Sequence, residues 1–139
     1  MDRDQLIAFF EEGIPFNRAL GMKVDSLEEG HIRLRMEPAA EHVGNPFLPA
    51  LHGGVISTLA DAAGGLAVFS TLEPTQGCST VDLRVDFIRR GDPTLTLVCE
   101  TKVVRAGNRV AVTDSTVFQA EEIVATARAV YNVVRRSAG

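Results

Sequence analysis

The chain has 139 residues, enough for one domain with a substantial core, and we expect residues 1–139 to form a single domain. Its formal net charge of −4 and its lack of a basic run argue against nucleic-acid binding. Two cysteines, Cys78 and Cys99, are too few for a disulfide scaffold, and the first residues lack the pattern of a secretory signal. We therefore expect a cytoplasmic protein.

Apolar periodicity predicts a short N-terminal helix followed by several strands and one long helix. Residues 2–12 have the pattern of an amphipathic helix, with Leu6, Phe9 and Phe10 on one side, and one further helical turn follows it. Residues 41–51 are predicted to form a loop that leads into the long helix. Alternation of apolar and polar residues predicts strands at residues 22–28, 31–37, 77–90, 94–105, 109–120 and 123–134.

The long apolar helix, from about Gly53 to Thr71, is predicted to form the centre of the fold. Twenty mostly apolar residues, 53–72, are long enough to span a bilayer. However, Asp61 near their centre would cost roughly 2.5–3.5 kcal/mol there, and the flanks lack the usual Lys, Arg, Trp and Tyr anchors. We therefore expect no membrane association and an α+β fold, in which an antiparallel β-sheet wraps around one long central helix.

The start of this helix carries the main functional signal, the segment from Leu51 to Asp61. Gly53 and Gly54, directly after His52, are expected to leave the first backbone N–H groups uncovered, which suits a developing oxyanion. Asp61 is the only charged residue between Gly53 and Ser70, and a carboxylate there suits a nucleophile or a general base. A structural alternative is a core aspartate bonded to Ser57 or Thr58, with His52 only capping the helix.

The spacing of these residues favours an active site shared between subunits. Gly54 and Asp61 lie seven residues apart on one helix, which places them roughly 10 Å apart along its axis. The two groups therefore do not reach one carbonyl together. If two copies of the helix ran antiparallel across a dimer interface, Asp61 of one copy would meet the Gly54 N–H of the other.

In this arrangement of elements, the chain resembles the PaaI-like acyl-CoA thioesterases of the hotdog superfamily. The matching features, in order along essentially the whole chain, are Pro15-Phe16 to Leu20-Gly21, Asn45, His52-Gly53-Gly54, Asp61 nine residues after His52, Thr80-Val81-Asp82-Leu83, Phe87-Ile88-Arg89 and the hairpin that contains Gly107. The resemblance implies a hotdog fold that assembles as a homodimer or as a dimer of dimers, a homotetramer, with shared active sites.

The resemblance also implies a role for each site residue in the hydrolysis of acyl-CoA. His52, Gly53, Gly54 and Asn45 would bind the thioester carbonyl, and Asp61 would attack it or activate water. A hydroxyl on the following strand would position that water; Thr80 fits the family pattern, with Ser79 as the alternative. The loop after Asn45 is one residue longer than the common family spacing. An aromatic, phenylacetyl-CoA-like acyl group is one candidate substrate.

Outside this motif, the residues suggest little further chemistry. Arg89, Arg90 and Asn108 are candidates for binding the phosphates of coenzyme A. We expect no cofactor, because coenzyme A is part of the substrate, and no metal, because the histidines lack ligand spacing. His31 and His42 are expected at the surface. Gly64 and Gly65 are expected to allow close helix–sheet or helix–helix packing, with the approach of a substrate as the alternative.

Two other functions compatible with a hotdog fold are an acyl-carrier dehydratase and a non-catalytic acyl-CoA-binding sensor. Such dehydratases pair a histidine with an acidic residue in a His-Phe-Pro-Gly-like loop, where this chain has His-Gly-Gly. The presence of Asp61 and the lack of an attached DNA-binding segment disfavour the sensor.

Overall fold

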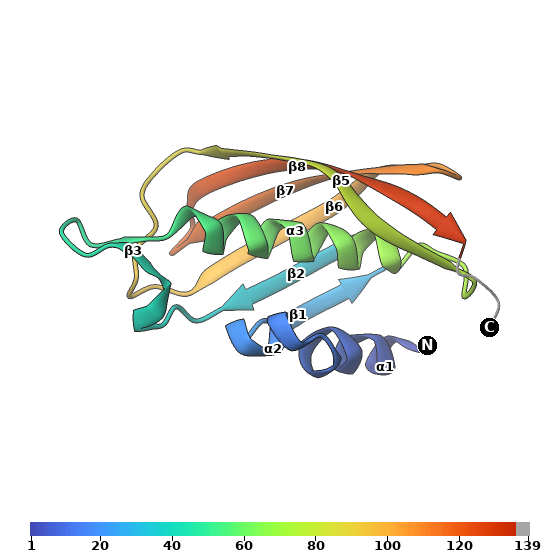
Figure 1. Cartoon of the computed structure of the whole chain (residues 1–139), viewed down its shortest axis with the longest axis horizontal. Coiled ribbons are helices and arrows are strands. Elements are labelled where there is room, and N and C mark those ends of the chain that lie inside the picture. Colours follow the sequence, from blue (N-terminus) through green and yellow to red (C-terminus); the bar gives the residue numbers. More distant parts are fainter. Residues whose placement is uncertain (136–139) are drawn as a thin grey trace.

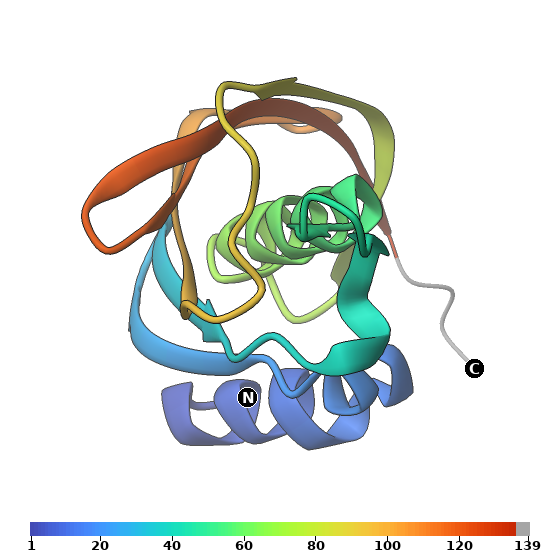
Figure 2. The same ribbon diagram turned by 90° about the vertical axis from the view of Figure 1, so that its left-hand side faces the viewer.

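A curved six-stranded antiparallel sheet surrounds a single long helix, α3 (Gly53–Phe69), in the computed structural model, which describes residues 1–135 (Figure 1, Figure 2). The predicted α+β architecture of a sheet wrapped around one long helix is therefore confirmed. The six strands are β1 (Lys23–Glu28), β2 (His31–Met36), β5 (Gln76–Phe87), β6 (Leu97–Ala106), β7 (Val110–Gln119) and β8 (Glu122–Arg135).

The order of strands in the sheet is β1-β2-β6-β7-β8-β5. Strand β5 therefore pairs with β8 rather than with β6, its successor in the chain, and residues 88–96 cross over the sheet between them. This topology leaves β5 at one edge of the sheet, beside α3. The edge of a sheet presents unpaired backbone N–H and C=O groups, so a second strand can pair there.

The core forms between α3 and the concave face of the sheet. Leu34, Cys99 and Val117 face one another on three adjacent strands, and each is fully buried. On the helix they meet a buried face of mainly small and aliphatic residues: Ile56, Leu59, Ala60, Ala63, Leu66 and Ala67. Small residues allow the helix to lie close to a strongly curved sheet. Within residues 1–135, no helix is both long and apolar enough to cross a membrane.

The N-terminal helical segment is divided into three short elements rather than one helix and a turn. These are α1 (Arg3–Ala8), a π-helical turn η1 (Phe9–Gly13) and α2 (Pro15–Leu20). Leu6 and Phe10 are buried in the same core as α3, and the segment lies across the side of the curved sheet that the strands leave open (Figure 2). It thereby brings apolar side chains opposite one face of α3.

The predicted loop before α3 contains local structure that the sequence did not reveal. A 3₁₀ turn, η2 (Ala40–His42), precedes a small hairpin of β3 (Val43–Asn45) and β4 (Ala50–Leu51). The expectation that His42 is a surface residue is wrong, because only 7% of it is exposed. Its ring Nδ1 accepts a hydrogen bond from the Ala39 N–H, and its carbonyl accepts one from the His52 N–H. His42 thus connects the hairpin to the start of α3.

Candidate active site

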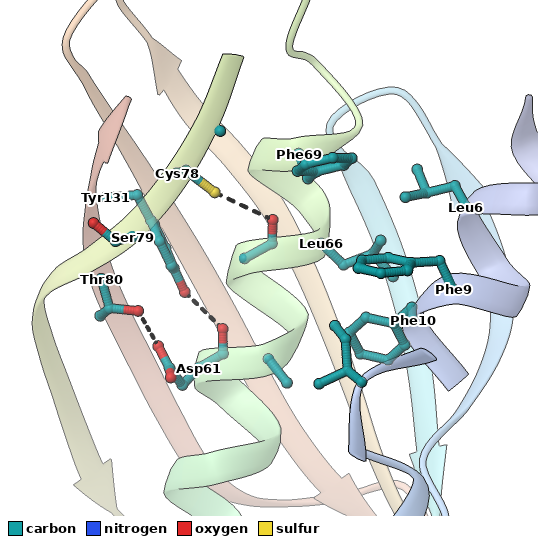
Figure 3. A pocket seen from close by; sticks show the side chains of 14 residues that line it. Leu6, Phe9, Phe10, Asp61, Leu66, Phe69, Cys78, Ser79, Thr80 and Tyr131 are labelled. Atoms are coloured by element: carbon teal, nitrogen blue, oxygen red, sulfur yellow. Dashed lines mark hydrogen bonds between the residues drawn. The ribbon is translucent and has the colours of Figure 1, made fainter. Parts of the chain in front are cut away.

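Asp61 lies on the half-buried face of α3, where its carboxylate contacts strand β5. The Thr80 hydroxyl donates a hydrogen bond to Oδ1 of Asp61 over 2.7 Å (Figure 3). The alternative partners considered from the sequence are not used, since the Thr58 hydroxyl instead donates to the Gly54 carbonyl. Asp61 is therefore not a fully buried core residue but a partly accessible carboxylate held by one hydroxyl from the sheet.

An irregularity in β5 accounts for the choice between the two neighbouring hydroxyls. The pairing of β5 with β8 shifts between Thr80 and Asp82, so that Val81 is an extra residue on β5. A β-bulge of this kind changes the direction in which side chains project, and bulges are frequent beside active sites. Thr80 projects towards Asp61, whereas the Ser79 hydroxyl points away from it (Figure 3).

Tyr131, which the sequence reasoning missed, fixes the backbone of α3 at Asp61. Its hydroxyl donates to the Asp61 carbonyl over 2.8 Å. Burial, together with the nearby Asp61 charge, raises the pKa of the Tyr131 phenol far above its usual range, so the hydroxyl stays protonated as a donor. The available signal was that this is the only tyrosine of the chain, on a strand face that it shares with Ala125, Ala127, Ala129 and Val133. A buried tyrosine hydroxyl usually has a hydrogen-bond partner.

A cavity of about 440 Å³ opens beside the Asp61–Thr80 pair. It lies between α3, the first half of β5 and the N-terminal helices, and most of its lining is apolar (Figure 3). The lining residues are Leu6, Phe9, Phe10, Ile14, Asp61, Ala62, Gly65, Leu66, Phe69, Gly77, Cys78, Ser79, Thr80 and Tyr131. The contribution of the N-terminal helices was not foreseen, because it depends on the packing of segments more than 45 residues apart in the chain.

Cys78 also lines this cavity, but its chemistry does not compete with that of Asp61. Burial raises the pKa of the Cys78 thiol, and the negative charge of Asp61 raises it further. The thiol is therefore neutral near pH 7 and a poor nucleophile. Burial in the core likewise raises the pKa of Cys99, to about 11.

At the start of α3, His52 forms the N-cap of the helix. Its ring Nδ1 accepts a hydrogen bond from the Gly54 N–H over 2.8 Å. The expectation that the Gly54 N–H is uncovered is therefore wrong within one chain. Since Nδ1 is the acceptor, a neutral His52 ring carries its proton on Nε2. The exposed His52 side chain thus presents an N–H donor of its own beside the helix end.

Asn45 lies near this helix end, at the end of β3. Its side-chain Oδ1 accepts a hydrogen bond from the Phe47 N–H over 3.0 Å, which begins the turn between β3 and β4. Gly44 packs on the start of α3, where a Cβ atom would lie only 2.6 Å from Cα of His52. The hairpin therefore places Asn45 and His52 at the same end of the molecule.

The predicted phosphate-binding residues are divided between the two ends of the sheet. Arg89 forms an ion pair with Glu122, and Arg90 donates to the Leu48 carbonyl over 3.5 Å; both line a second cavity with Gly53 at the start of α3. Asn108 lies in the turn between β6 and β7, next to the last residues of β8 and far from the start of the helix. One chain therefore does not bring Asn108 together with the two arginines.

The predicted site residues thus form two groups on one chain. Asp61 and Thr80 lie at the first cavity, whereas Asn45, His52, Gly53 and Gly54 lie at the start of α3, about seven to eight residues earlier on the helix. At 1.5 Å per residue, the two groups are on the order of 10 Å apart. Among the described residues, no three His, Cys, Asp or Glu side chains converge as a metal site would require.

Comparison with known proteins identifies the class to which this arrangement belongs. The sequence profile of the thioesterase superfamily matches residues 48–126, which include α3, β5 and most of the later strands. The chain belongs to the thioesterase superfamily, and it is an enzyme of the thioester-hydrolase class.

Individual relatives support the more specific resemblance. The chain is 37% identical to the medium/long-chain acyl-CoA thioesterase YigI of Escherichia coli over 134 residues, with 86% of each chain covered. The structure of the E. coli PaaI protein, from the phenylacetic acid degradation operon, matches with a TM-score of 0.84 and 25% identity, over 97% of this chain and 93% of PaaI.

A Streptococcus mutans protein solved with bound acetyl-CoA matches with a TM-score of 0.75 and 26% identity, over 84% of this chain and 91% of the other. The resemblance to PaaI-like thioesterases is confirmed by these relatives together.

Proposed function

We propose that this thioesterase hydrolyses acyl-CoA thioesters to a free acid and coenzyme A, with Asp61 as the nucleophile or general base. The observation that carries the proposal is the contact between Asp61 and the Thr80 hydroxyl at the opening of an apolar cavity. A reactive carboxylate beside an apolar cavity matches a substrate with a polar thioester and an apolar acyl group.

In the proposed reaction, the carbonyl carbon of the thioester is attacked by a water molecule that Asp61 deprotonates, or by Asp61 itself. The carbon–sulfur bond then breaks, and the thiolate of coenzyme A leaves and takes up a proton. When Asp61 attacks directly, water cleaves the resulting anhydride in a second step. The Thr80 hydroxyl donates a hydrogen bond to Asp61, so the lone pairs of its oxygen remain to accept a hydrogen bond from the attacking water.

Charge develops on the carbonyl oxygen during the attack, and the start of α3 is suited to stabilise it. The partial positive charge of a helix N-terminus attracts an oxyanion. Because His52 Nδ1 accepts from the Gly54 N–H, we assign the donor role to the Gly53 N–H and to His52 Nε2–H, with Gly54 holding the ring. Asn45, at the same end, would supply a further side-chain N–H.

The separation of the two groups of residues leads us to propose that each site is formed by two subunits. Asp61 and Thr80 of one chain would face the start of α3 of another, in a homodimer or in a tetramer formed by two such dimers. The edge strand β5 lies beside Asp61 and carries exposed apolar side chains, Val81 and Phe87, which a second copy would cover.

The mainly aliphatic and aromatic lining of the cavity suits an unsubstituted apolar acyl group. The YigI relative is named for medium and long chains, and we propose a chain of this class as the substrate. A phenylacetyl group, the aromatic candidate from the sequence, also consists of apolar atoms. A panel of acetyl-, butanoyl-, octanoyl-, decanoyl-, benzoyl- and phenylacetyl-CoA, followed by thiol release, distinguishes these groups.

The Asp61→Asn variant tests the proposed chemistry. The amide keeps the shape of the side chain and accepts a hydrogen bond from Thr80, but it is neither a base nor a nucleophile. We expect kcat to fall by about 10²-fold or more on the preferred acyl-CoA. The melting temperature and the far-ultraviolet circular dichroism spectrum should stay close to those of the wild type. A folded variant with a wild-type kcat would overturn the mechanism.

A further inference from the structure

One face of α3 forms the floor of the cavity. Asp61, Gly65 and Phe69 are each four residues apart, so they lie one above the other along the helix, and all three line the cavity (Figure 3). The carboxylate is at one end of this row and the Phe69 ring at the other. Gly65, between them, carries no side chain, and its carbonyl accepts a hydrogen bond from the Cys78 thiol over 3.8 Å.

The two adjacent glycines of α3 serve different purposes. A Cβ atom at Gly64 would lie 2.2 Å from the Tyr131 hydroxyl oxygen, so this glycine is required by packing, as expected from the sequence. A Cβ atom at Gly65 would meet only Cε1 of Tyr131, at the ordinary contact distance of 3.8 Å. Within residues 1–135, the expected close packing is therefore seen at Gly64 and not at Gly65. A Cβ atom there would clash with no other protein atom of residues 1–135.

A glycine in the middle of a helix is unfavourable, by about 1 kcal/mol relative to alanine. Packing within the described chain gives no reason for a glycine at position 65. A ligand in the space beside it would give one. That space is continuous with the Asp61–Thr80 pair and is bordered by apolar side chains of the N-terminal helices: Leu6, Phe9, Phe10 and Ile14. An acyl chain attached to a carbonyl at Asp61 fits this geometry, because its polar atoms would stay at the carboxylate end.

The distance between Asp61 and Phe69 also sets the length of acyl chain that fits along the helix. Eight residues separate Asp61 from Phe69, which corresponds to about 12 Å of helix axis. An extended hydrocarbon chain advances about 1.25 Å per bond, given a single bond of about 1.5 Å. About eight to ten carbons therefore reach from Asp61 to Phe69, and the chain would pass Gly65 after roughly its fifth carbon.

We propose that Gly65 is a specificity-determining residue, because it leaves open the path along α3 by which an unbranched acyl chain of about eight to ten carbons extends from Asp61 to Phe69. The inference rests on the proposed acyl-CoA hydrolysis and adds the position of the acyl chain and the residue that admits it. Phe69 closes the far end of the path and so limits the length of the chain.

The test measures kcat/KM for butanoyl-CoA and decanoyl-CoA with the wild type and with Gly65→Ala and Gly65→Leu. A leucine at this position would extend from an unobstructed Cβ position into the path, and it would lean towards the helix N-terminus. We expect the decanoyl-to-butanoyl ratio to fall by about tenfold or more with leucine, which corresponds to the loss of about two buried methylene groups. Alanine should give a smaller decrease in the same direction.

Butanoyl-CoA is the internal control, because its chain ends before Gly65, and it should lose less activity than decanoyl-CoA when a side chain is added there. Phe69→Ala is the opposite control: by opening the far end, it should raise activity on dodecanoyl-CoA relative to decanoyl-CoA. The molar mass of each variant, from light scattering, reports on subunit assembly.

Equal losses on both substrates, or a change in molar mass with the loss of activity, would show that a second subunit fills this space, and the proposal would fail. An unchanged ratio in both Gly65 variants would also overturn it, because the acyl chain then lies elsewhere. If Gly65→Leu does not fold, Gly65→Ala still decides, since alanine favours the helix. In all these outcomes the wild type hydrolyses acyl-CoA, so they differ from a failure of the proposed function, in which no acyl-CoA is cleaved.

Discussion

At the scale of single residues, the site depends on the direction in which Thr80 donates. The Thr80 hydroxyl donates a hydrogen bond to Asp61. This bond keeps the carboxylate oriented towards the cavity and leaves the threonine oxygen free to act as an acceptor. In the proposed mechanism, this arrangement orients water during the reaction but contributes little to the binding of a large acyl-CoA. Thr80 is therefore expected to affect the rate of the chemical step more than substrate affinity.

We accordingly expect Thr80→Ala to lower kcat by about tenfold or more, at the low end of the range for the loss of a positioning group, while KM changes little. Thr80→Ser keeps the hydroxyl and should restore most of the activity. Ser79→Ala is the matched control, since the Ser79 hydroxyl points away from Asp61 (Figure 3). Steady-state kinetics with these three variants measure the effect. A larger loss with Ser79→Ala would transfer the role to Ser79.

At the scale of secondary-structure elements, the helix and the sheet are held together where Tyr131 of β8 meets α3. The tyrosine hydroxyl bonds to the Asp61 carbonyl, and the missing side chain of Gly64 makes room for it. This contact fixes the position of the helix turn that carries Asp61 relative to strand β5, which carries Thr80. Packing and catalytic geometry are therefore coupled at this point.

From this contact we expect Gly64→Ala to destabilise the fold by about 1–3 kcal/mol through overpacking, although alanine is the better helix former. Tyr131→Phe removes the oxygen atom that the new methyl group would meet. The effect of Gly64→Ala should therefore be smaller in a Tyr131→Phe background. Urea denaturation of the two single variants and the double variant measures this coupling. Additive effects would mean that the two residues do not constrain each other.

At the scale of the whole molecule, the proposed sharing of sites has a direct test by complementation. Asp61→Asn removes the carboxylate. Gly54→Pro removes the N–H that holds His52, and proline is tolerated in the first turn of a helix. A mixed dimer of these two chains would contain one site with both defects and one intact site. Random pairing at equal concentrations would then restore about one quarter of the wild-type sites.

Each variant alone should be nearly inactive, and activity should appear only after subunit exchange, which mass spectrometry of differently tagged chains can follow. Mixing each variant with wild-type chain is the control for dilution. If mixed dimers form but remain inactive, both groups act from the same chain and the shared site is wrong.

The sequence alone predicted the six strands of the large sheet and the long helix, and it singled out Asp61 and the His52-Gly53-Gly54 segment as candidate site residues. Periods of two and of about 3.6 residues report which faces are buried, and these local patterns predicted the strands and the long helix. The isolated Asp61 in an apolar helix and the His52-Gly53-Gly54 segment were visible because burial of a charge and bare glycines are unusual in any context.

What the sequence left open depends on contacts between distant segments. The β5 bulge that selects Thr80 over Ser79, the Tyr131 bond to the Asp61 carbonyl and the N-terminal side of the cavity each join residues that are far apart in the chain. The hydrogen bond from the Gly54 N–H to the His52 ring joins neighbouring residues. It depends on the orientation of that ring, which the amino-acid sequence does not reveal. Only the tertiary structure distinguished Gly64, which packs on Tyr131, from Gly65, which faces the cavity, because neighbouring residues on a helix point about 100° apart and meet different surroundings.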